Sequence, residues 1–175
     1  MKSRAYKNYI FDFYGTLVDI LTDEKDPVLW DKLCQLYQAY GAAYEGETLK
    51  KAYAKRVDQA RKELIDLKGV AYPEIDLAHI FNQLYVDARP QSSSSNQPED
   101  WGQLIAMVFR VLSRKHVTAY PHTKEVLAFL KEQGCRIYLL SNAQAAFTNA
   151  EIDLMALRPY FDAIYLSSDA GICKP

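Results

Sequence analysis

Side chains able to attack and hold an anion follow three apolar segments of the sequence. In chain order they are Asp12, Tyr14, Gly15 and Thr16, then Ser141 and Asn142, and finally Ser167, Ser168, Asp169 and Lys174. A carboxylate at the end of a buried strand is a candidate nucleophile. A hydroxyl and an ammonium group donate hydrogen bonds to an anion, and a glycine lets the backbone approach a ligand closely. Asp12, Gly15, Ser141 and Lys174 are therefore the first candidates for a site.

The apolar segments are predicted to be strands of a parallel sheet. Residues 8–13 form a nearly continuous apolar run closed by a Gly-Thr turn, which is the pattern of a strand buried on both faces. Beyond His116 the sequence predicts a helix over 123–133, a strand over 136–140, a helix over 145–155 and a strand over 162–166. This alternation is typical of an α/β fold with a parallel sheet. In such sheets ligands bind at the carboxyl ends of the strands, where the candidate side chains lie.

Between these parts lies a long stretch, 20–116, that is predicted to be helical throughout. Asp26 and Pro27 suit the N-cap and the first position of a helix that Gly41 terminates. Three more helices are predicted over 47–68, over 73–87 and from about 98 to 114. A short Ser-rich loop, 92–95, separates the last two helices. We interpret the whole stretch as an insertion placed after the first strand.

Length, charge and cysteine usage exclude several classes of protein. A chain of 175 residues fits one domain with an insertion. Its 21 Lys and Arg against 22 Asp and Glu give no field for a nucleic acid or an anionic membrane, so neither is an expected partner. The most apolar stretch, 104–112, contains Arg110 and is far shorter than the roughly 20 residues that span a bilayer. Widely spaced cysteines indicate reduced thiols, and the expected location is cytoplasmic.

Three motifs produce a resemblance to a known family. They are Asp-Phe-Tyr-Gly-Thr-Leu-Val-Asp at 12–19, Leu-Leu-Ser-Asn at 139–142 and Ser-Ser-Asp-Ala-Gly-Ile-Cys-Lys-Pro at 167–175. In this order, and in an α/β context, they resemble the first three motifs of the haloacid dehalogenase-like (HAD) hydrolases. The resemblance implies a Rossmann-like HAD core of residues 1–19 and 117–175. It also implies an α-helical cap, 20–116, which is inserted after the first strand and closes over the site.

The resemblance implies a role for each candidate residue. Asp12 would be the nucleophile that forms a covalent aspartyl intermediate, and Lys174 would offset the charge that develops during attack. The residues implied for substrate binding are Gly15, Thr16, Ser141 and Asn142. In the family's phosphatases, magnesium joins the nucleophile's carboxylate and a main-chain carbonyl to the phosphoryl oxygen. The metal ligands here would be Asp12 and the carbonyl of Tyr14.

Tyr14 stands where the family's phosphatases have a second aspartate that acts as general acid and base. An unperturbed tyrosine titrates at about 10, so at pH 7 it donates a proton but is a poor base. The haloacid dehalogenases proper have tyrosine at this position, and their displacement at carbon needs no magnesium. They also use a cap arginine to receive the halide, for which Arg56 and Arg61 are available. A role of Tyr14 in packing or substrate contact competes with a catalytic role.

The sequence ends at Pro175, directly after the third motif, so the family's fourth motif, an acidic pair, is missing. We therefore expect a core that is incomplete at its C-terminus, weak or absent magnesium binding, and self-association through exposed core surface. The leading expectation for function is a magnesium-dependent phosphatase that acts on a small phosphate ester through an aspartyl phosphate. The alternatives are a 2-haloacid dehalogenase, favoured by Tyr14, and a catalytically impaired binding protein.

Overall fold

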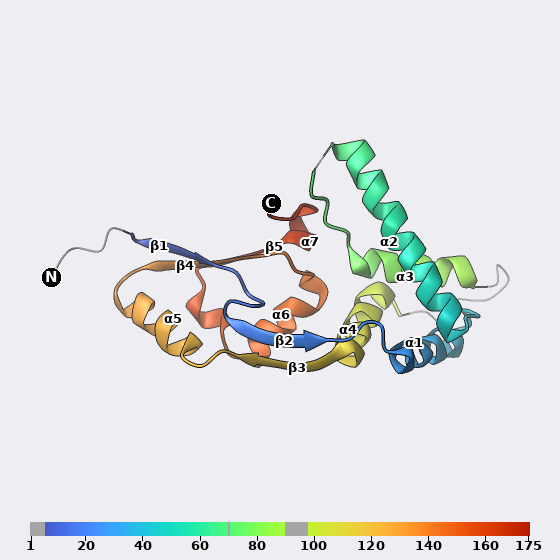
Figure 1. The fold of residues 1–175 in the computed structure, drawn as a ribbon, viewed down its shortest axis with the longest axis horizontal. Helices are drawn as coiled ribbons and strands as arrows, with labels where there is room; N and C mark the ends of the chain where they lie inside the picture. The colour runs from blue at the N-terminus through green and yellow to red at the C-terminus, as the bar shows by residue number, and fades with distance from the viewer. Residues whose placement is uncertain (1–5, 70, 90–97) are drawn as a thin grey trace.

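The chain folds into a parallel sheet, a two-stranded ribbon and a group of helices (Figure 1). The computed structural model describes residues 6–69, 71–89 and 98–175, and the predicted Ser-rich loop 92–95 lies outside these ranges. None of the helices in the described ranges is long and apolar enough to cross a membrane. The predicted α/β class with a parallel sheet is confirmed.

Three strands form the parallel sheet, in the order β1, β4, β5. They are β1 (Asn8–Phe11), β4 (Arg136–Ser141) and β5 (Ala163–Leu166). The register places Phe11 beside Leu139, and Ser141 beside Leu166. The carboxyl ends of the three strands therefore meet at one edge, as the candidate site requires.

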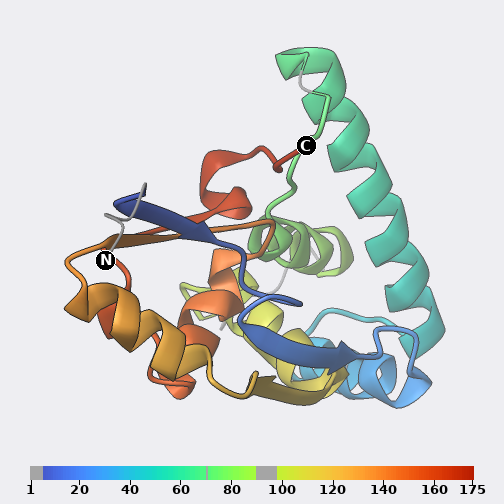
Figure 2. The same ribbon diagram turned by 60° about the vertical axis from the view of Figure 1, so that its left-hand side comes forward.

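Helices cover one face of this sheet (Figures 1 and 2). The helices of this part are α5 (Thr123–Glu132), α6 (Ala145–Leu154), the 3₁₀ turn Arg158–Tyr160 and the short α7 (Ser167–Ala170). Ile137 and Leu139 of β4 are fully buried together with Leu127 of α5 and Ile152 of α6. Alternate side chains of the strands thus build one apolar core beneath the sheet.

The opposite face of the sheet is exposed in the described part of the chain. Ile10 of β1 is 66% exposed and Tyr165 of β5 is 57% exposed. The prediction that the first strand is buried on both faces is therefore wrong. An apolar run predicts a strand, but it does not tell whether helices cover one face or two.

Four helices form a separate layer with its own apolar cluster, and we call them the helical layer. They are α1 (Pro27–Ala39), α2 (Gly46–Lys68), α3 (Leu77–Ala88) and α4 (Trp101–Ser113). The cluster is rich in buried aromatic side chains, namely Trp30, Tyr37, Phe81, Tyr85, Trp101 and Phe109. Asp26 accepts a hydrogen bond from Val28 N at 3.0 Å, and Pro27 takes the first helical position. This predicted helix start is confirmed.

A two-stranded antiparallel ribbon joins the helical layer to the sheet (Figure 2). It consists of β2 (Val18–Thr22) and β3 (Arg114–Ala119), so the prediction that 20–116 is helical throughout is wrong at both ends. Both strands contain β-branched side chains that favour extended backbone. Apart from a local bridge between Tyr14 and Val18, the two strands pair with each other, and they lie far apart in the sequence, so a local pattern did not predict them.

The segment 71–76, which we call the linker, connects α2 to α3 in an extended conformation. A helix was predicted to start at Pro73, but Pro73 instead forms an antiparallel bridge with Ile172. The helix begins at Leu77, because Asp76 caps it by accepting from Ala78 N at 2.9 Å. The bridge between Pro73 and Ile172 holds the linker against the C-terminal segment.

Candidate active site

The carboxylate of Asp12 lies just beyond β1 with donors from two other segments. Lys174 Nζ is 3.0 Å from Asp12 Oδ2, and the buried Ser141 lies beside this carboxylate. The backbone N–H of Phe13 donates to Oδ1 at 2.8 Å. Burial would raise the pKa of Asp12, but the hydrogen bonds from Ser141 and Lys174 outweigh it and hold the pKa below its usual value. Asp12 is therefore ionised at neutral pH, as a nucleophile must be.

Strand pairing and one side chain bring these groups together. The parallel pairing of β1 with β4 places Asp12 beside the end of β4, where Ser141 lies. Asn142 then holds the C-terminal segment: its Oδ1 accepts from Lys174 N at 2.6 Å, and its Nδ2 donates to Lys174 O at 3.3 Å. Lys174 Nζ also donates to Leu140 O at 2.8 Å. The structure thus brings four predicted site residues, Asp12, Ser141, Asn142 and Lys174, into one group.

Gly15 and Thr16 form the turn that follows Asp12, and both are exposed. Gly15 has a φ of 75°, in the left-handed region that glycine adopts without strain. Its N–H donates to Val18 O at 2.8 Å, which closes the turn. The turn therefore leaves Thr16 exposed in the segment that follows Asp12.

The side chain of Tyr14 is engaged elsewhere in the fold. Its hydroxyl donates to Glu151 Oε2 at 2.5 Å and lies 3.1 Å from Thr148 Oγ1, both on α6. Burial raises the pKa of Tyr14 well above its usual value, and the bond to Glu151 adds to this rise against the opposing effect of Arg110. The phenol is thus a neutral hydrogen-bond donor to α6.

The family model of haloacid dehalogenase-like hydrolases matches residues 6–175 of the chain. The chain belongs to the HAD-like hydrolase family. The matched range contains all the site residues described above, from Asp12 to Lys174. Members of this family are hydrolases that act on small-molecule substrates. No curated protein matches the sequence.

Solved structures similar to this HAD-like hydrolase include dehalogenases and phosphatases. The L-2-haloacid dehalogenase of Xanthobacter autotrophicus is 19% identical with a TM-score of 0.43; the match covers 97% of this chain and 60% of that one. A second dehalogenase is 19% identical with a TM-score of 0.47, covering 99% and 67%. A "predicted phosphoglycolate phosphatase" from Haemophilus somnus 129pt is 18% identical with a TM-score of 0.45, covering 97% and 66%. The chain thus spans 60% of the length of the Xanthobacter enzyme.

A buried ionic network in this HAD-like hydrolase surrounds the Tyr14 hydroxyl. Arg110 of α4 pairs with Glu151 through two bonds, Nε to Oε1 at 2.8 Å and Nη2 to Oε2 at 3.0 Å. Arg114 Nη1 adds a third bond at 3.0 Å. The Arg110 guanidinium lies 5.0 Å from the centroid of the Tyr14 ring and 4.7 Å from that of Phe147. The network ties the helical layer to α6 and to the segment that contains Asp12.

The sequence patterns single out neither Glu151 nor a partner for Arg110. Each is a charged residue among the apolar positions of its helix, at 3% and 9% exposed. Charges are seldom buried unless they are paired, so these two positions did contain a signal. The pairing itself depends on how α4 packs against α6, which local sequence does not specify.

The two arginines suggested for halide binding in this HAD-like hydrolase lie in different surroundings. Arg56 is paired with Asp87, with Nε to Oδ2 at 2.9 Å. Arg61 instead lines a cavity of about 470 Å³ between the helical layer and the loop after β4. The cavity wall also includes Tyr53, Glu74 and Gln144. Arg61 is therefore the arginine of the pair that faces a space large enough for a small molecule.

Enzymes of this family generally use Mg²⁺, which binds oxygen donors. Asp12 supplies one carboxylate, and its Oδ2 already faces the Lys174 ammonium group. Across the described residues, no group of three or more His, Cys, Asp or Glu side chains is arranged to hold a metal ion. A magnesium ion takes about six oxygen ligands. At this site the side chains thus offer the ion one carboxylate, that of Asp12, and its other ligands would be main-chain carbonyls, water and substrate.

Proposed function

We propose that the chain is a hydrolase in which Asp12 attacks the halogen-bearing carbon of a small 2-haloacid. The observation that supports this proposal is the hydrogen bond between the Tyr14 hydroxyl and Glu151. This hydroxyl donates to the ionised Glu151, so no acid or base side chain faces Asp12 from the position where phosphatases of the family have one. A halide leaves without a proton, whereas an alcohol leaving a phosphate ester needs one.

The proposed reaction has two steps. One oxygen of the Asp12 carboxylate forms a bond to the carbon, and the carbon–halogen bond breaks with its electron pair leaving on the halide. Water then attacks the carbonyl carbon of the resulting ester, which releases a 2-hydroxyacid and a proton and restores Asp12. The Lys174 ammonium group and the Ser141 hydroxyl lie at Asp12 and hold the substrate carboxylate during attack.

A magnesium-dependent phosphatase acting on a small phosphate ester is the second candidate. The observation in its favour is the same group of donors, because a hydroxyl and an ammonium beside a carboxylate also suit a phosphoryl group. Its proposed magnesium ligands are Asp12 and the carbonyl of Tyr14. In this candidate the nucleophile forms an aspartyl phosphate, and protonation of the leaving alcohol comes from water.

Two parallel assays separate the candidates. The purified 175-residue chain is incubated with 2-chloropropionate in EDTA, and chloride release is measured. It is also incubated with a generic aryl phosphate and Mg²⁺, and phosphate release is measured. We expect chloride release that is unaffected by EDTA. Phosphate release that depends on Mg²⁺, without chloride release, would contradict the proposal and support the phosphatase; neither activity would support a binding protein.

The variant Tyr14→Phe tests whether the phenol takes part in the chemistry. We expect kcat/KM to stay within about threefold of wild type, because the hydroxyl is bonded to Glu151 and Thr148. The unfolding free energy should fall by about 1–3 kcal/mol, since Glu151 loses a donor in a buried site. Tyr9→Phe, which removes a phenol outside this network, is the control. A rate loss above about 100-fold with unchanged stability would show instead that Tyr14 acts as acid or base.

The exposed sheet face supports the predicted self-association, which we propose as a property of the chain. Ile10 and Tyr165 lie on this face at 66% and 57% exposure, and a second copy would bury them. We expect light scattering to show a mass that rises with concentration, and Tyr165→Lys to reduce this rise. Val28→Lys changes an equally exposed side chain on α1 and is the control, because it lies away from the sheet. A concentration-independent monomer would overturn this expectation.

A further inference from the structure

The linker 71–76 runs against the C-terminal segment 171–174, which ends in Lys174 (Figure 1). Two main-chain hydrogen bonds join them, from Glu74 N to Gly171 O at 3.3 Å and from Cys173 N to Tyr72 O at 2.9 Å. On one side, therefore, the linker between α2 and α3 holds the segment that contains Lys174. The other side is held by Asn142.

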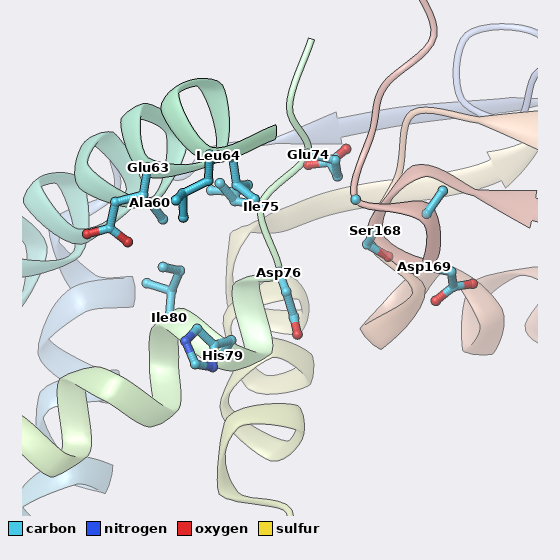
Figure 3. Close-up of a pocket in the computed structure, with 13 residues that line it drawn as sticks. Ala60, Glu63, Leu64, Glu74, Ile75, Asp76, His79, Ile80, Ser168 and Asp169 are labelled. Atoms are coloured by element: carbon cyan, nitrogen blue, oxygen red, sulfur yellow. The ribbon is translucent and has the colours of Figure 1, made fainter. Parts of the chain in front are cut away.

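The side chain of Glu74 is the centre of this contact. Figure 3 shows it on the linker, between α2 and the short helix α7 that contains Ser168. Its Oε2 accepts from the Ser167 hydroxyl at 2.5 Å and from the Cys173 thiol at 3.2 Å, and its Oε1 accepts from Gln144 Nε2 at 2.9 Å. Ser167 and Gln144 are buried, at 6% and 8% exposed. A carboxylate suits this place because it is an acceptor at both oxygens.

Each of the three donors lies close to a residue of the candidate site. Cys173 directly precedes Lys174 in the sequence, and Gln144 follows Asn142 by two positions. Ser167 follows β5, and its hydroxyl oxygen accepts from Ala143 N at 2.8 Å. Gln144 also binds the linker through Nε2 to Ile75 O at 2.8 Å. One carboxylate thus links the loop after β4, the start of α7 and the C-terminal segment.

We propose that Glu74 is a positioning residue of the active site, which fixes the C-terminal segment and the loop 141–144 so that Lys174 faces Asp12. The inference rests on the proposed function, in which the Lys174 and Asp12 pair performs the chemistry. Without a carboxylate at position 74, three donors lose their shared acceptor, and the two buried ones cannot turn to bulk water. Glu74 lies between α2 and α3, so the placement of the helical layer and that of Lys174 depend on each other.

The variant Glu74→Gln tests this inference, with Glu63→Gln as the matched control. Glutamine keeps the size of the side chain, but it has a single acceptor oxygen and sets an N–H₂ group against the remaining donors. Glu63 of α2 and Glu74 both line a second cavity, of about 410 Å³, which Figure 3 shows. Glu63 is exposed and accepts a hydrogen bond from Gln59 of its own helix at 2.9 Å. We expect Glu74→Gln to lower kcat about tenfold or more with KM within about twofold. Glu63→Gln should leave both constants unchanged.

The thiol of Cys173 gives a second readout that does not depend on activity. Burial raises the pKa of the Cys173 thiol, and the Glu74 carboxylate raises it further. Glu74→Gln should therefore speed alkylation of Cys173 by iodoacetamide at pH 8 by about fivefold or more, as measured by peptide mapping. Cys34 and Cys135 are buried, at 4% and 7% exposed, and should stay protected.

The two readouts decide between the possible outcomes. Faster alkylation confined to Cys173, together with a lower kcat, supports the positioning role. Alkylation of all three cysteines means general unfolding and overturns it, as does a variant with wild-type kcat and wild-type alkylation. If the wild-type chain releases neither chloride nor phosphate, the proposed function has failed; the alkylation rate then still tests whether Glu74 holds the C-terminal segment.

Discussion

Replacing Asp12 by Asn is expected to reduce turnover about 1,000-fold or more, because an amide does not attack carbon or phosphorus as a carboxylate does. The fold should remain, since Asp12 is partly exposed and Lys174 keeps its bond to Leu140 O at 2.8 Å. The measurement is product release, with thermal unfolding as the check on folding. The loss should be the same with a haloacid and with a phosphate ester.

A labelling experiment ties this loss to a covalent intermediate. In a single turnover in water enriched in ¹⁸O, hydrolysis at the ester carbonyl places one heavy oxygen in the side chain of Asp12. Mass spectrometry of the peptide that contains Asp12 detects it. Asp19→Asn is the matched control, because Asp19 lies in the same motif but on β2, where it contacts His116 Nε2 at 3.0 Å. An Asp12→Asn variant with more than about a tenth of wild-type turnover would rule out Asp12 as the nucleophile.

Glu151→Gln is expected to lower the free energy of unfolding by about 3–5 kcal/mol, the usual cost of removing one partner from a buried ion pair. The side chain of Glu151 is 3% exposed and that of Arg110 is 11% exposed, so the guanidinium left behind stays out of water. Urea unfolding measures this loss. Asp153→Asn on the same helix is the control, because its pair with Arg158 is exposed to solvent and its loss should cost far less.

The same network determines how the free energy of unfolding changes with pH. Burial would raise the pKa of Glu151, but hydrogen bonds from Arg110 and Tyr14 outweigh it and hold the pKa below its usual value. The stability that Glu151 contributes is therefore present above the unfolded value of about 4.3 and is lost as the pH falls through the lower folded value. We expect the wild-type chain to lose stability on acidification more steeply than Glu151→Gln. Equal acid profiles, or a Glu151→Gln cost no larger than that of Asp153→Asn, would contradict the assigned role.

The parts of the fold that were predictable are those with local signals. Asp26 and Pro27 mark the start of α1, and a chain that alternates helices with short apolar runs after residue 116 specifies the parallel sheet. The meeting of Asp12 with Ser141 followed from the sheet as well, because parallel strands end at the same edge.

The remaining features depend on contacts between distant segments. The strands β2 and β3 pair with each other across the whole helical layer. Tyr14 is adjacent to the nucleophile's motif, yet its hydroxyl is placed by Glu151, which sequence spacing does not relate to it. Lys174 was a candidate without a predicted position, and Asn142 and the linker determine where it lies.

The ribbon has a consequence for how the helical layer is attached. Thr22 pairs with Arg114 and Val18 with Ala119, so the chain leaves for α1 and returns from α4 at neighbouring points. Because the ribbon holds the two ends of this insertion together, the entropic cost of lengthening the insertion rises only slowly with the number of residues. The helical layer beyond the ribbon can therefore be replaced, in evolution or by design, while the parallel sheet keeps Asp12 in place. The same sheet can then be combined with different helical layers, each offering other side chains to a ligand.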